Sequence, residues 1–145
     1  MEGNKELLLY IYKNASMGLN LSNKLFKLLN NKDNKIKSVI SDICKTYEDI
    51  CKKTKKYLKK YKEEPKEESI MLKISSNLGI DMEVIKDNSD ARMADMLIKG
   101  FTMGNVEINK NIKKYKDSTD KNIIKLANEL LKFGEDSIEK LKKYL

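Results

Sequence analysis

The chain has 145 residues, of which 40% are hydrophobic and 36% are charged, and its formal net charge is +8. These values are typical of one soluble helical domain with its own core, and they argue against disorder. No apolar run approaches the ~18 residues of a membrane span, and MEGNKELLLYIYKN at the N-terminus lacks the features of a signal peptide. We therefore expect a single domain, residues 1–145, that is cytoplasmic and not transmembrane.

The first helical pattern covers about residues 4–30, where apolar or small residues recur every three or four positions. These residues are Leu8, Ile11, Ala15, Gly18, Ser22, Leu25 and Leu29. The turn NNKDN at 30–34 ends the pattern, and Asp33 or Asn34 can cap the next helix.

The second pattern, about residues 34–62, is the most regular of the four. Its stripe consists of Ile36, Ile40, Ile43, Tyr47, Ile50, Thr54, Tyr57 and Tyr61, which predicts coiled-coil-like packing against a partner helix. Cys44 and Cys51 lie seven positions apart on this helix, ~10 Å along its axis. That separation excludes a disulfide between them, so we interpret both as small apolar residues beside the core.

A connector at about 63–88 follows, because EEPKEES breaks the helical pattern at a proline. Within it, IMLKISSNLG predicts a short helix that stops at Gly79. DNSD at 87–90 then supplies caps for a third long helix, about 89–116, and a turn at KDSTD leads to a fourth, about 119–144. The stripe of the third helix is Ala94, Leu97, Phe101, Gly104, Ile108, Ile112 and Tyr115, and that of the fourth is Ile124, Ala127, Leu131, Gly134, Ile138, Leu141 and Leu145.

Four helices with one apolar stripe each predict an all-α four-helix bundle. Short turns join helices one and two and helices three and four, so each pair should be antiparallel. The long connector favours a ferritin-like arrangement with one crossover between helices two and three. An up-down-up-down bundle is the alternative.

The third helix carries two glycines, although each costs a helix interior about 1 kcal/mol relative to alanine. Folding each helix pair about its turn brings five residues to one level: Gly18, Tyr47, Phe101, Gly104 and Gly134. In one interpretation this level is a close-packed layer, so that Gly104→Leu would overpack the core. In the other it is a mid-bundle cavity that holds a ligand or a metal.

A flank beside this stripe extends the apolar face of the third helix and is a candidate contact surface for a partner. Its members are Met93, Met96, Gly100, Met103 and Glu107. Thioethers can bind Cu(I), but methionine-rich flanks more often fill gaps or meet partners.

The segment ADMLIKGFTMGNVEI, in its lysine-rich helical setting, resembles small ferritin-like helical proteins of low-GC bacteria. Among these are spore-coat proteins with a comparable D-x-L-I segment on a helix. The resemblance implies a ferritin-like fold. It does not imply di-iron chemistry, because the chain has no histidine and therefore no Glu-x-x-His.

Positive charge is concentrated on the second helix, in CKKTKKYLKKYK. The lysines that could contact phosphates of nucleic acid or an acidic membrane are Lys52, Lys53, Lys55, Lys56, Lys59, Lys60 and Lys62. Such binding would be weak and independent of sequence, because Arg92 is the only arginine able to read a base edge bidentately.

Catalysis has little support, because histidine, phosphate-binding loops and nucleotide motifs are absent from the sequence. We therefore expect a non-enzymatic protein with no catalytic residues, no metal and no cofactor. A structural or protein-interaction module with a protein partner is favoured, and homo-oligomers are compatible with the stripes. The alternative is a weak anion binder, and a third hypothesis is a ferritin-like metal or redox protein.

Overall fold

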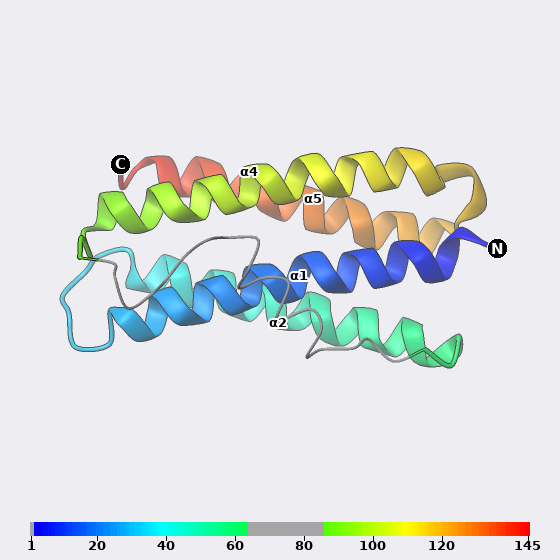
Figure 1. Ribbon diagram of the computed structural model, residues 1–145, viewed down its shortest axis with the longest axis horizontal. Helices are drawn as coiled ribbons and strands as arrows, with labels where there is room; N and C mark the ends of the chain where they lie inside the picture. Colours follow the sequence, from blue (N-terminus) through cyan, green and yellow to red (C-terminus); the bar gives the residue numbers. More distant parts are fainter. Residues whose placement is uncertain (1, 64–85) are drawn as a thin grey trace.

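The computed structural model describes residues 2–63 and 86–145, and four long helices make up most of this part of the chain (Figure 1). They are α1 (Gly3–Leu28), α2 (Lys37–Lys60), α4 (Asp90–Tyr115) and α5 (Lys121–Lys142). A short 3-10 helix, η2 (Lys116–Ser118), precedes α5, and no strand occurs among the described residues. The all-α class is therefore confirmed, and each long helix begins and ends within three residues of its predicted bounds. The predicted short helix of the connector lies outside the described residues.

The helices pack as two antiparallel pairs, α1 with α2 and α4 with α5 (Figure 1). Helix α1 also packs along α4, and α5 contacts both α1 and α2. Helices α2 and α4 run in the same direction, as Figure 1 shows. Of the contacts between the two pairs, the one between α1 and α4 is the most extensive, and the candidate site lies along it.

Asparagine side chains tie the pairs together at both ends. At one end, Asn4 Nδ2 donates to Tyr61 Oη (2.8 Å) and Asp120 Oδ2 (2.9 Å), and the Asp120 amide donates to Asn4 Oδ1 (2.7 Å). At the other end, Asn34 Nδ2 donates to the Asn88 carbonyl (2.8 Å) and to Asp90 Oδ1 (2.9 Å). Asn34 therefore does not cap α2, because its side chain is engaged with the start of α4. Helix α4 has the predicted type of cap, since Ser89 Oγ accepts from the Arg92 amide at 3.2 Å.

The core follows the predicted stripes closely on α2 and less closely on α5. On α2, the stripe is buried from Ile36 to Thr54, whereas Tyr57 and Tyr61 are half-buried. On α5, Ala127, Gly134 and Leu141 of the predicted stripe are buried, whereas Ile124, Leu131 and Ile138 are half-buried and Leu145 is exposed. Ile123, Leu126 and Leu130, one position before predicted members, are buried as well. Helix α5 contacts α4, α1 and α2, so its apolar face is wider than a single stripe. None of the described helices is long and apolar enough to cross a bilayer.

Candidate functional site

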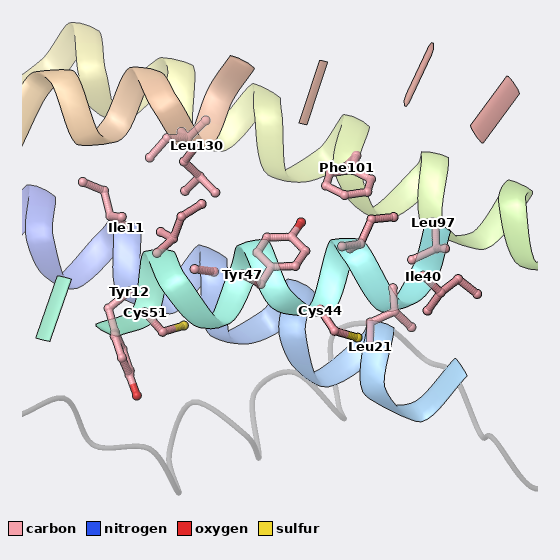
Figure 2. Close-up of a cluster of buried hydrophobic side chains, with 14 of the residues drawn as sticks. Ile11, Tyr12, Leu21, Ile40, Cys44, Tyr47, Cys51, Leu97, Phe101 and Leu130 are labelled. Atoms are coloured by element: carbon pink, nitrogen blue, oxygen red, sulfur yellow. The ribbon is translucent and has the colours of Figure 1, made fainter. Parts of the chain in front are cut away.

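Three aromatic rings from three helices meet in the middle of the bundle. Tyr47 of α2 stacks on Phe101 of α4, with ring centroids 5.7 Å apart, and Phe133 of α5 contacts both rings edge-on at 4.9 and 5.5 Å. Figure 2 shows Tyr47 reaching from α2 towards Phe101. The sequence-based level contained Tyr47 and Phe101 but missed Phe133, because Phe133 lies beside the stripe assigned to α5. The rotation of α5 about its own axis turns Phe133 towards the other two rings, and the sequence pattern did not predict this rotation.

Gly18 of α1 makes room for the tip of the Tyr47 ring. A Cβ atom at position 18 would lie 2.1 Å from Tyr47 Cζ and 2.5 Å from its hydroxyl oxygen. No real side chain could occupy this space while the ring stays in place. The glycine therefore lets Tyr47 cross the bundle and reach the side where α1 faces α4.

A groove opens along this side, which we call the α1–α4 groove, with a volume of about 450 Å³. Its floor consists of buried residues: Leu21, Ser22, Tyr47, Leu97, Phe101 and Leu130. Its walls and mouth consist of half-buried or exposed residues: Tyr10, Lys13, Asn14, Met17, Gly18, Gly100, Met103, Gly104, Asn105 and Glu107. Ligand sites of proteins have volumes of about 300–1,000 Å³ and mostly apolar linings, so the groove falls in their range.

Gly100 and Gly104 keep this groove open from the α4 side. A Cβ atom at position 104 would lie 3.4 Å from Asn14 Nδ2, its nearest neighbour, and one at position 100 would lie 3.3 Å from Leu21 Cδ2. Both distances are much longer than the 2.1 Å at Gly18, so a Cβ atom at position 100 or 104 would not overlap its neighbour. Asn14 Nδ2 instead donates to the Gly104 carbonyl at 3.1 Å and so joins α1 to α4 across the groove wall.

Gly134 belongs to a different contact from the one that the level assignment gave it. A Cβ atom there would lie 2.2 Å from Asn105 Oδ1, so the glycine accommodates a polar side chain of α4. Gly134 does not line the groove, whereas Asn105 does. Of the five residues of the predicted level, Tyr47 and Phe101 stack on each other, and Gly18 and Gly134 are closely packed against a side chain of another helix. Gly104 instead lies in the wall of the groove.

The Tyr47 hydroxyl lies at the floor of the groove without a hydrogen bond to any other described residue. Tyr47 is only 6% exposed, and its burial raises the pKa of the phenol far above the ordinary value of 10.0. The group is therefore a protonated donor. The side chain is buried as a whole, but its oxygen is not among the fully enclosed polar atoms that lack a partner, so it is accessible from the groove.

The mouth of the groove carries charged and polar groups. Tyr10 Oη donates to Glu107 Oε2 at 3.4 Å, and Lys110 Nζ lies 3.6 Å from Glu107 Oε1. Burial and, secondarily, the Glu107 carboxylate raise the pKa of Tyr10 to about 12. The floor contains no ionisable group apart from the Tyr47 phenol. The interior of the groove is thus neutral, and its charges lie at the rim.

The proposed methionine flank needs a correction. Met93 and Met96 are 0% and 6% exposed, so they belong to the core and are not available to a partner. Helix α4 packs against both α1 and α5, and this buries a wider face than one stripe. Met103 is 60% exposed and Glu107 is also exposed, while Gly100 lines the groove.

The seven lysines of α2 and its C-terminal end are all exposed, and we call them the lysine face. Lys53 Nζ lies 3.7 Å from Glu129 Oε2, and Lys60 Nζ lies 5.2 Å from the centroid of the Tyr57 ring. Tyr57 is half-buried beneath this lysine, so it is not an exposed platform on which a base could stack. The lysine face could therefore contact a polyanion through its positive charges, but not through stacking on Tyr57.

Residues 2–63 and 86–145 contain no group of three or more Cys, Asp or Glu side chains that could hold a metal ion. Cys44 and Cys51 are buried and form no disulfide with each other, as expected from their spacing. Burial and, secondarily, Glu48 raise the pKa of the Cys44 thiol, which disfavours the reactive thiolate.

Comparisons with known proteins give no match to a protein-family model, to a curated protein or to a solved structure.

Proposed function

We propose that this protein is a non-enzymatic binding protein that holds a small, mainly apolar molecule in the α1–α4 groove. The observation that carries the proposal is the groove itself, an opening of about 450 Å³ with a largely apolar, buried floor in the middle of the bundle. A filled core would have closed it, because protein interiors are packed as densely as organic crystals. The glycines of α4 are the residues that leave it open.

A fluorescence titration with N-phenyl-1-naphthylamine, a neutral dye that brightens in apolar sites, tests the proposal. We expect saturable binding with a Kd on the order of 10 µM, within reach of an apolar ligand of this size. Gly104→Leu should fill the groove and abolish binding while the circular dichroism spectrum stays helical. Val106→Leu is the matched control, because Val106 lies on the same helix, 51% exposed and outside the groove. Equal binding by wild type and Gly104→Leu, or no saturable binding by wild type, would overturn the proposal.

We also propose a ferritin-like connection of the four helices. Its support is the position of the helix ends: the end of α2 lies near Asn4 and Asp120, whereas α4 begins near Asn34. This separation of the two ends supports a single crossover between α2 and α4. Energy transfer between dyes attached near residue 60, at the end of α2, and near residue 90, at the start of α4, tests this arrangement. We expect a separation close to the length of the bundle, and a short separation would contradict the crossover.

Weak polyanion binding by the lysine face is a second candidate function, because all seven lysines are exposed. Binding should depend on counterion release, fall steeply with salt and show a Kd on the order of 10⁻⁵ M at physiological salt. Fluorescence anisotropy with labelled DNA at two salt concentrations should show weaker binding after Lys→Gln changes at 52, 55, 56 and 59. Four Lys→Gln changes at the exposed positions 110, 113, 114 and 116 give a control of equal net charge. An equal loss in both variants would assign the binding to overall charge.

A further inference from the structure

We infer that the ligand of the α1–α4 groove is a neutral aromatic molecule with a hydrogen-bond-accepting oxygen, and that the Tyr47 hydroxyl donates to this oxygen. This inference rests on the proposed function, since it names the class of molecule that the groove would hold. Three features of the groove carry it: the Tyr47 hydroxyl, the aromatic rings that line the floor and the position of the charges.

The hydroxyl supplies the polar part of the argument. Tyr47 is 6% exposed, lines the floor and has no hydrogen bond to another described residue. The hydroxyl oxygen is not among the fully enclosed polar atoms that lack a partner, so a ligand acceptor in the groove can reach it and receive its hydrogen bond. The nearby Ser22 hydroxyl does not compete, because it donates to the Gly18 carbonyl at 2.7 Å.

The rings and the charges define the rest of the ligand. Tyr47 and Phe101 both line the groove and stack on each other at 5.7 Å, so the floor offers aromatic surface to a flat molecule. The charged groups Lys13 and Glu107 lie at the walls and mouth, and Glu107 already pairs with Lys110 and Tyr10. A charge buried at the floor would lack a partner of opposite sign, which excludes an ionised ligand group there.

Two neutral naphthalene dyes of similar size separate the hydrogen bond from apolar binding. Prodan carries a ketone oxygen, and its emission moves to longer wavelength when that oxygen accepts a hydrogen bond. N-phenyl-1-naphthylamine has no such acceptor. We expect Tyr47→Phe to weaken prodan binding about five-fold, the effect of one hydrogen bond, and to shift the emission of bound prodan to shorter wavelength. The affinity for N-phenyl-1-naphthylamine should stay within about two-fold.

Tyr57→Phe is the matched control, because it removes a hydroxyl from the same helix at a position that does not line the groove. It should leave both affinities and the prodan emission unchanged. Thermal melts complete the test: the Tm of Tyr47→Phe should equal or exceed that of wild type, because the lost hydroxyl has no partner in the free protein.

The outcomes separate the two proposals. If neither dye binds wild type, the groove is not a ligand site and both proposals fail. If both dyes bind but Tyr47→Phe changes neither the affinity for prodan nor its emission, the proposed function stands and this inference is wrong. A marked fall in the Tm of Tyr47→Phe would also overturn it, since the hydroxyl would then be bonded within the protein.

Discussion

Gly18 and Gly104 occupy similar positions in the sequence patterns of their helices, yet the space around them is used in opposite ways. At Gly18 the missing side chain is replaced by the Tyr47 ring, which comes within 2.1 Å of where a Cβ atom would lie. At Gly104 the nearest atom to that point is 3.4 Å away, and the space beyond it belongs to the groove. A glycine in a helical stripe can therefore indicate either a closely packed contact or an opening, and only the neighbouring side chain decides which.

Gly18→Ala should give the largest effect on stability. The methyl group would overlap the Tyr47 ring, and overpacking of this kind costs about 1–3 kcal/mol or more, against a gain of about 1 kcal/mol in helix propensity. Because the overlap with the ring is severe, we expect the upper end of this range, a net loss of up to about 2 kcal/mol, in urea unfolding followed by circular dichroism. Adding Tyr47→Leu to Gly18→Ala should recover part of the loss, because the overlap is removed. Wild-type stability of the single variant would show that the ring is free to move away.

Gly134→Ala should cost less, about 1 kcal/mol. Its methyl group would overlap the Asn105 side chain, but Asn105 is half-buried and lines the groove, so its amide can rotate into open space. The same unfolding measurement tests this, and Asn105→Ser should restore the stability of Gly134→Ala. A loss as large as that at Gly18 would mean that Asn105 is fixed.

Gly104→Ala should have the opposite sign and stabilise the protein by about 0.5 kcal/mol, since helix propensity improves and only a light contact with Asn14 is added. The close-packed hypothesis predicts a loss at this position instead. Thermal melts of Gly104→Ala beside Gly18→Ala test the comparison directly. If both variants lose stability equally, the groove is closed in solution.

The smallest expected effect is that of pH on dye binding. The chain has no histidine, and the groove tyrosines stay protonated, because the pKa of Tyr10 is raised to about 12 and that of Tyr47 is raised further by burial. The Kd for N-phenyl-1-naphthylamine should therefore be constant between about pH 6 and 9. A clear transition in this interval would show that an ionisable group contacts the ligand.

Stability, in contrast, should fall at high pH. The folded chain holds protons on Tyr10 and Tyr47 that the unfolded chain loses near pH 10, so the folded state binds more protons above that value. The stabilisation is complete below about pH 10 and decreases as pH rises above it. Tyr47→Phe should flatten this decrease in melts recorded between about pH 9 and 11.

The sequence was sufficient to predict the helices and most of the core, because both depend on periodicity and on local capping. Ser89 at the start of α4 and the buried stripe of α2 are examples. The site was predicted only in part. The short turn between their helices predicts that Gly18 and Tyr47 lie at one level. The rotation of α5 and the shape of the groove depend instead on how the two helix pairs pack together, above all on how α4 lies against α1. Asn14 and Asn105 carry no periodic signal, since their roles arise from contacts between distant segments.

The asparagine contacts at the two ends of the bundle bear on how a molecule would enter the groove. Asn4 holds the start of α1 against Asp120, which follows α4 closely in the chain, and Asn34 holds the turn after α1 against the start of α4. Because hydrogen bonds hold α1 and α4 together near both ends, the two helices can separate slightly in the middle but cannot rotate apart about one end. A molecule that binds in the groove, as we propose, would then have to pass the side chains at its mouth, above all the exposed Met103. Its rate of entry should follow rotamer motion of these side chains rather than separation of the helices.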